Sequence, residues 1–144
     1  MEQTGLLRRM KWYQATALFS VLFALVGFSY NVWRLEVTEH NSSVREAAFE
    51  SLLQLAELEQ LVFAAHYDQD PVAGNPRVGW VKVGLIIDLS AICGEGVQAA
   101  ALVLKQTWSE DWASMASDQE ATERIVAAID ATRLAVKDSL SMLD

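Results

Sequence analysis

The sequence predicts an all-α protein with one N-terminal transmembrane helix, followed by an extracytoplasmic antiparallel bundle of about three helices. Three observations predict this fold class. Residues 12–32 carry no charge, apolar residues further along recur in steps of three and four, and a cluster of turn-forming residues at 68–76 separates two such stretches. Steps of three and four are the spacing of one helix face, and short connections favour antiparallel neighbours.

The uncharged run predicts a membrane anchor at residues 12–33. These 22 residues, as a helix rising about 1.5 Å per residue, span about the 30 Å of a bilayer's hydrocarbon core. Trp12 and Tyr13 lie at one end, and Tyr30 and Trp33 lie at the other. Because amphipathic aromatic rings prefer the headgroup level, we expect these four residues to hold the anchor in membrane lipid.

Basic residues predict the orientation of this anchor. Arg8, Arg9 and Lys11 precede it, whereas the residues just after it are mainly acidic. The positive-inside rule then keeps 1–11 in the cytoplasm and places 34–144 in the periplasm or another extracytoplasmic space, with the anchor in the inner (plasma) membrane.

A cleaved signal peptide is the alternative to an anchor. The basic start and the apolar core at 15–28 suit a signal peptide, and small residues at Gly27 and Ser29 precede a conceivable cut at Tyr30. The anchor is favoured because the uncharged run continues past residue 28 and ends in a second pair of aromatic residues.

Composition limits the remainder to one acidic domain. Its 111 residues, 34–144, suffice for one small domain and hold 8 Lys/Arg against 18 Asp/Glu, a net charge of −10. Such a surface repels nucleic acid and anionic lipid headgroups, so nucleic acid is not an expected partner. The single cysteine, Cys93, excludes an intramolecular disulfide, and its apolar surroundings predict a small core residue.

A heptad seam predicts the first helix of the domain at about 43–67. Small or apolar residues recur there in alternating steps of four and three. Asn41, Ser42 and Ser43 could cap a fresh helix, yet the helix could also continue straight from the anchor. The seam is the expected surface for helix packing or for a partner, and its residues are Val44, Ala48, Ser51, Leu55, Leu58, Val62 and Ala65.

The second helix is predicted at about 76–106, with Asn75 as its cap and Pro76 at its first position. Its expected buried face consists of Val78, Val81, Leu85, Leu89, Ile92, Val103 and Leu104. Four glycines fall inside this range, and each costs about 1 kcal/mol relative to alanine within a helix. A kink or break at Gly94, Glu95 and Gly96 is therefore the alternative.

The third helix is predicted at about 118–142, where Ser117 and Glu120 have the spacing of a capping box. The link at 107–116 holds Trp108 and Trp112, which we expect to close one end of the bundle. The outer face of this helix is charged, as on an ordinary solvated surface.

An alternative topology places a second span at 83–104. This stretch is apolar, but it contains Asp88 and Glu95, and a carboxylate near a bilayer centre costs about 2.5–3.5 kcal/mol. The two charges favour a soluble segment. If the segment did span, the two carboxylates would indicate an ion or proton path.

No catalytic, cofactor-binding or metal-binding residue is predicted, and an enzyme is not expected. His40 and His66 are 26 positions apart, too far for a ligand pair on one helix. His66, Asp68 and Asp70 cluster near a helix end, where such residues ordinarily serve as caps and turns. No nucleotide-binding or nucleophile motif is present.

Two function classes are compatible with this plan. The first is a single-pass interaction protein, an accessory or assembly subunit whose helical domain packs against another membrane protein or a second copy. The second is a small-molecule-sensing bundle that acts through a partner. Its plan is similar to that of the helical sensor domains of chemoreceptors, an analogy of architecture alone.

Overall fold

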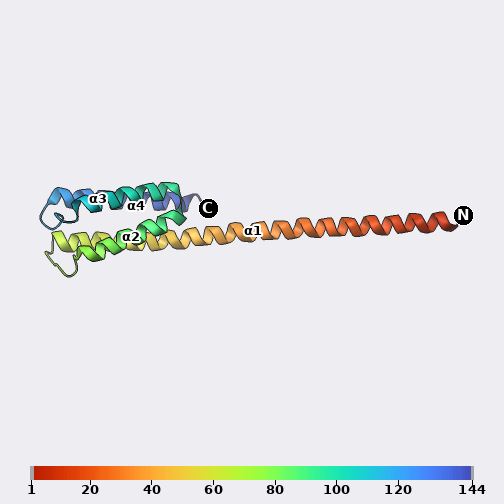
Figure 1. Ribbon diagram of the computed structural model, residues 1–144, viewed down its shortest axis with the longest axis horizontal. Coiled ribbons are helices and arrows are strands. Elements are labelled where there is room, and N and C mark those ends of the chain that lie inside the picture. The colour runs from red at the N-terminus through yellow and green to blue at the C-terminus, as the bar shows by residue number, and fades with distance from the viewer. Residues whose placement is uncertain (1, 144) are drawn as a thin grey trace. The chain divides into compact units, whose positions relative to one another are not determined.

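The computed structural model describes the backbone of residues 2–143 and the side chains of residues 12–36 and 38–143. The described chain is all-α and has four helices, α1 (Glu2–His66), α2 (Pro76–Cys93), α3 (Glu95–Asp111) and α4 (Gln119–Ser141) (Figure 1). It divides into two units, Met1–His40 and Asn41–Asp144.

The first unit is the N-terminal part of α1. Within the described residues, α1 is the one helix with a stretch long and apolar enough to cross a membrane, a test that an N-terminal signal sequence also meets. The hydroxyls of Thr16 and Ser20 donate to the carbonyl oxygens four residues earlier, at 2.8 and 2.9 Å. These polar groups of the apolar run are therefore satisfied without water.

The structure describes the side chains of the aromatic residues predicted to anchor this unit, but not those of the basic residues predicted to orient it. Trp12, Tyr13, Tyr30 and Trp33 are all exposed, and the rings of Tyr30 and Trp33 lie 6.2 Å apart. The side chains of Arg8, Arg9 and Lys11 lie outside the described ones. The orientation that depends on those three residues stays a prediction.

Helix α1 continues into the second unit without a break at Asn41, Ser42 and Ser43, so the fresh cap considered there does not form. It ends at His66, one residue before the predicted end. The heptad seam of α1 faces inward, because all seven of its residues are buried: Val44, Ala48, Ser51, Leu55, Leu58, Val62 and Ala65.

The second unit is a bundle in which residues 41–66 of α1 pack with the other three helices. Its core cluster draws buried residues from all four. Successive helices run in opposite directions within this unit (Figure 1). Glu57 of α1 pairs with Lys82 of α2, and Glu59 of α1 pairs with Arg133 of α4 at 2.6 Å. Helix α1 thus lies between α2 and α4, and α3 packs against the same two helices.

A break at Gly94 makes the number of bundle helices four where about three were predicted. The single helix expected at 76–106 is wrong, and the alternative break is confirmed. Gly94 has φ of 112° and ψ of 168°, a backbone conformation that side chains with a Cβ rarely adopt. The chain therefore reverses at one residue, and α3 supplies a fourth helix from the same chain.

The same break removes the single helix that a second span at 83–104 would need. Residues 83–93 belong to α2 and residues 95–104 to α3, which pack against each other. Asp88 and Glu95 are both exposed in this unit.

Trp108 joins α2 and α3 through a close approach to Gly79. The expected link at 107–116 is wrong at its start, because α3 continues to Asp111 and Trp108 is a fully buried helical residue. A Cβ on Gly79 would overlap the Trp108 ring. The Trp108 Nε1–H is also the one buried side-chain polar group, among those described, without a hydrogen-bond partner. Packing alone therefore positions this ring.

Asp118, and not Ser117, caps α4. Its carboxylate accepts a hydrogen bond from the Glu120 backbone N–H at 3.0 Å. Asp111, at the end of α3, accepts two hydrogen bonds from the Arg124 guanidinium of α4, at 3.0 and 2.7 Å. This contact raises the pKa of Arg124 and fixes the α3–α4 connection.

Candidate functional site

The predicted interface residues of α1 lie inside the bundle. Val44, Ala48, Leu55, Leu58 and Val62 are each at most 4% exposed. Four of the five belong to the core cluster shared with α2, α3 and α4. Their structural role is therefore packing within one chain, and a surface for another protein has to be sought among the exposed residues.

The polar residues at the end of α1 are occupied by local hydrogen bonds. His66 Nδ1 lies 2.8 Å from the Met115 carbonyl oxygen, and Nε2 lies 2.7 Å from Gln119 Oε1. Asp70 Oδ1 accepts from the backbone N–H groups of Val72 and Ala73, which lowers the pKa of this carboxyl. Within the described part of the chain, no three His, Cys, Asp or Glu residues are grouped so as to hold a metal.

The outer side of α2 carries an unusual row of exposed apolar residues, which we call the α2 outer stripe. Its members recur in steps of three and four, with the charged Asp88 at the one position that interrupts them. They are 37–71% exposed: Val78, Val81, Leu85 and Ile92.

This stripe corrects the predicted buried face of the second helix. Of the seven residues assigned to that face, Leu104 is buried, Leu89 is half-buried and the remaining five are exposed. The inner face of α2 consists instead of a different row of residues: Gly79, Val83, Ile86, Ser90 and Cys93. Both rows have helical spacing, so the sequence pattern could not say which row faces the core.

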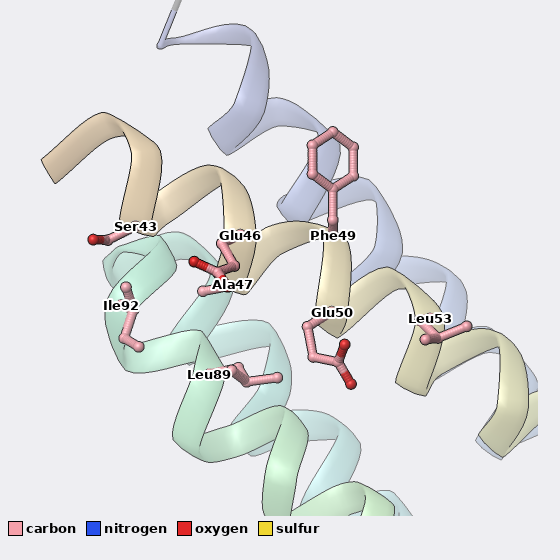
Figure 2. Close-up of a pocket in the computed structure, with 8 residues that line it drawn as sticks. All are labelled: Ser43, Glu46, Ala47, Phe49, Glu50, Leu53, Leu89 and Ile92. Atoms are coloured by element: carbon pink, nitrogen blue, oxygen red, sulfur yellow. The ribbon is translucent and has the colours of Figure 1, made fainter. Parts of the chain in front are cut away.

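A groove adjoins the stripe where α1 and α2 lie side by side (Figure 2). Phe49 and Leu53 of α1 and Leu89 and Ile92 of α2 supply its large apolar side chains, and the buried Ala47 lies between them. The cavity volume is about 640 Å³. We call it the α1–α2 groove, and Ser43, Glu46 and Glu50 complete its lining.

Carboxylates, and no basic residues, line this groove. Glu46 and Glu50 extend along its α1 side (Figure 2). Glu50 accepts a hydrogen bond from Gln54 at 2.9 Å, and no ion pair between described residues involves Glu46, Glu50 or Asp88. Lys82 of α2 is paired with Glu57, and it also donates a hydrogen bond at 3.2 Å to Oε1 of Gln54, the residue that donates to Glu50. The groove therefore combines apolar walls with two carboxylates that form no ion pair between described residues.

Sequence reasoning missed this groove because it is formed by two segments about 40 residues apart. Phe49 and Leu53 lie outside the heptad seam, and nothing local in the sequence indicates which residues of α2 lie next to them. Comparisons with protein-family models, with curated proteins and with solved structures found no match to this chain.

Proposed function

We propose that this chain is a single-pass membrane-anchored interaction protein, an accessory or assembly subunit whose bundle docks on a larger membrane protein. The α2 outer stripe is the observation that supports this proposal most strongly. A helix that is apolar on both sides is ordinarily buried on both sides, and α2 has only one side covered by its own chain.

The magnitude of the uncovered surface supports a binding role. Burying one valine, leucine or isoleucine side chain contributes about 1.5–3 kcal/mol relative to full exposure, and the α2 outer stripe offers four partly exposed ones. Single exposed apolar residues are common on protein surfaces, but four in one row beside an apolar groove, interrupted only by Asp88, are a clustering typical of interaction sites.

The N-terminal apolar helix gives the second part of the proposal. With residues 12–33 in the inner membrane and 1–11 in the cytoplasm, the bundle is confined to the extracytoplasmic face. Confinement near the same membrane raises the effective concentration of a membrane-bound partner. A weak docking surface then suffices for stable association.

The experiment is purification of the full-length protein from its native membrane in a mild detergent, with identification of the co-purifying chains by mass spectrometry. We expect a stoichiometric membrane protein with the wild type, and its loss with Val81→Ser and Leu85→Ser combined. The matched control is Leu134→Ser on α4, because Leu134 is 61% exposed and lies outside the stripe.

Two outcomes would count against this proposal. Recovery of the bait alone from wild-type membranes would favour a ligand-binding bundle, which should then gain thermal stability with its ligand. Equal retention of the partner by the stripe variant and the Leu134→Ser control would show that α2 is not the docking surface.

A further inference from the structure

The shape of the α1–α2 groove suits a helix. It lies between two antiparallel helices, and the α2 outer stripe continues beside it from Val78 to Ile92. Fourteen residue steps of helix correspond to about 21 Å, or about four turns. A partner helix recognised in such a groove places its own apolar residues at i, i+3, i+4 and i+7.

The negative charge of the groove favours partner helices that carry positive charge. Glu46 and Glu50 line it, and Asp88 interrupts the neighbouring stripe, with no described ion pair at any of the three. Lysine or arginine residues flanking the apolar face of a partner helix would meet these carboxylates. Charge complementarity of this kind contributes mainly to specificity and association rate.

The same charge disfavours two other occupants. A second copy of this chain seated groove against groove would bring two pairs of glutamates together, because a two-fold interface apposes identical surfaces. Anionic lipid headgroups would likewise be repelled by Glu46 and Glu50.

We propose that the α1–α2 groove binds a cationic amphipathic helix of a partner protein, with its apolar face against Phe49, Leu53, Leu89 and Ile92 and its basic residues against Glu46 and Glu50. This inference rests on the proposed function, since it names the chemistry of the partner that an interaction protein would bind.

The test uses the full-length protein in a neutral detergent and a fluorescent amphipathic peptide of about 18 residues, with leucines at helical spacing and flanking lysines. A second peptide has glutamate in place of every lysine, and empty micelles are the blank. Fluorescence anisotropy measures both affinities. We expect the lysine peptide to bind saturably and the glutamate peptide to bind at least tenfold more weakly.

Two sets of variants locate the binding site. Glu46→Gln with Glu50→Gln removes two charges and should weaken lysine-peptide binding about threefold to tenfold. The matched control, Glu110→Gln with Glu123→Gln, removes two exposed charges elsewhere, each accepting a hydrogen bond from a glutamine as Glu50 does. Phe49→Ser with Ile92→Ser should weaken binding about tenfold or more, because apolar anchors dominate such interfaces.

Three results would overturn the inference. The first is equal binding of the two peptides, and the second is an equal effect of the groove and control charge variants. The third is a wild-type dimer that Phe49→Ser with Ile92→Ser dissociates, which would assign the groove to a second copy. Retention of a native membrane partner despite any of these results would leave the proposed function intact and refute only the cationic helix.

Discussion

Helices α2 and α4 perform the same task inside the bundle and differ on the outside. Each buries one face in the shared core. The outward positions of α4 are occupied by charged, polar or small residues, apart from Leu134, whereas those of α2 carry the α2 outer stripe. Their interiors differ too, because α2 contains Gly79 and Gly84 and α4 contains no glycine.

This difference distinguishes the inner apolar faces, which the bundle needs in order to fold, from the outer apolar row of α2, which folding does not explain. The bundle needs one apolar face on each helix, and α4 shows that a charged outer face is compatible with it. The second apolar row of α2 contributes little to the core, so the fold does not account for it, and the proposed function assigns it to contact with a partner. The following changes test that division, beginning with the inner face of α2.

Trp108→Ala should have the largest effect on stability. The ring is fully buried against Gly79 of α2, so its removal leaves a cavity and should lower the free energy of unfolding by about 3–5 kcal/mol. Urea unfolding followed by circular dichroism measures this. Trp112→Ala is the control, because Trp112 is 37% exposed, and an equal loss in both variants would contradict the role given to Trp108.

Gly94→Ala and Gly84→Ala should change stability in opposite directions. Gly94 has φ of 112°, so alanine there should cost about 1–3 kcal/mol. Gly84 lies within α2, where a Cβ would meet no neighbouring atom within 4 Å, so alanine there should stabilise the protein by about 0.5–1 kcal/mol. Thermal unfolding of both variants measures the difference. A loss of stability in both variants would show that a Cβ at position 84 meets neighbouring atoms, and would contradict the open surroundings of Gly84.

Leu85→Lys should change stability by no more than about 0.5 kcal/mol, as Leu134→Lys should on α4. Both side chains lie at outward positions, 37% and 61% exposed. Urea unfolding measures the two variants side by side. A much larger loss at Leu85 would show that the α2 outer stripe supports the fold, and the comparison between the helices would then fail.

The pH dependence of Cys93 should give the smallest effect. Burial raises the pKa of this thiol, so the folded state holds the proton more tightly than the unfolded state does. The resulting stabilisation is complete below the unfolded-state pKa and is lost as the pH rises through the folded-state pKa. We expect the wild type to lose more stability than Cys93→Ala between about pH 7 and about pH 10, measured by urea unfolding. Parallel losses would contradict burial of the thiol.

The sequence predicted those features that depend on local chemistry. The apolar run at 12–33 gave one helix able to cross a membrane, the heptad seam gave the buried face of α1, and Asn75 caps α2 by accepting from the Arg77 backbone N–H at 3.0 Å. Each of these depends on residues within a few turns of one another.

Features that depend on tertiary contacts escaped prediction. Glycine occurs both inside helices and at chain reversals, as Gly84 and Gly94 show. The residue type alone therefore could not predict whether the helix breaks at Gly94. The inner face of α2 includes Gly79 because of the Trp108 ring, a contact between residues 29 positions apart. The α1–α2 groove escaped for the same reason.

The reversal at Gly94 also determines the end of the bundle at which α4 finishes. With an even number of antiparallel segments, the end of α4 returns to the end of the bundle where Asn41 begins, and the Arg45 guanidinium lies 3.5 Å from the Leu143 carbonyl oxygen. Only the two connecting loops occupy the opposite end. A reporter fused to the C-terminus would therefore lie at the end of the bundle that holds Asn41. A short epitope inserted at Val72, which is 83% exposed, would lie at the opposite end.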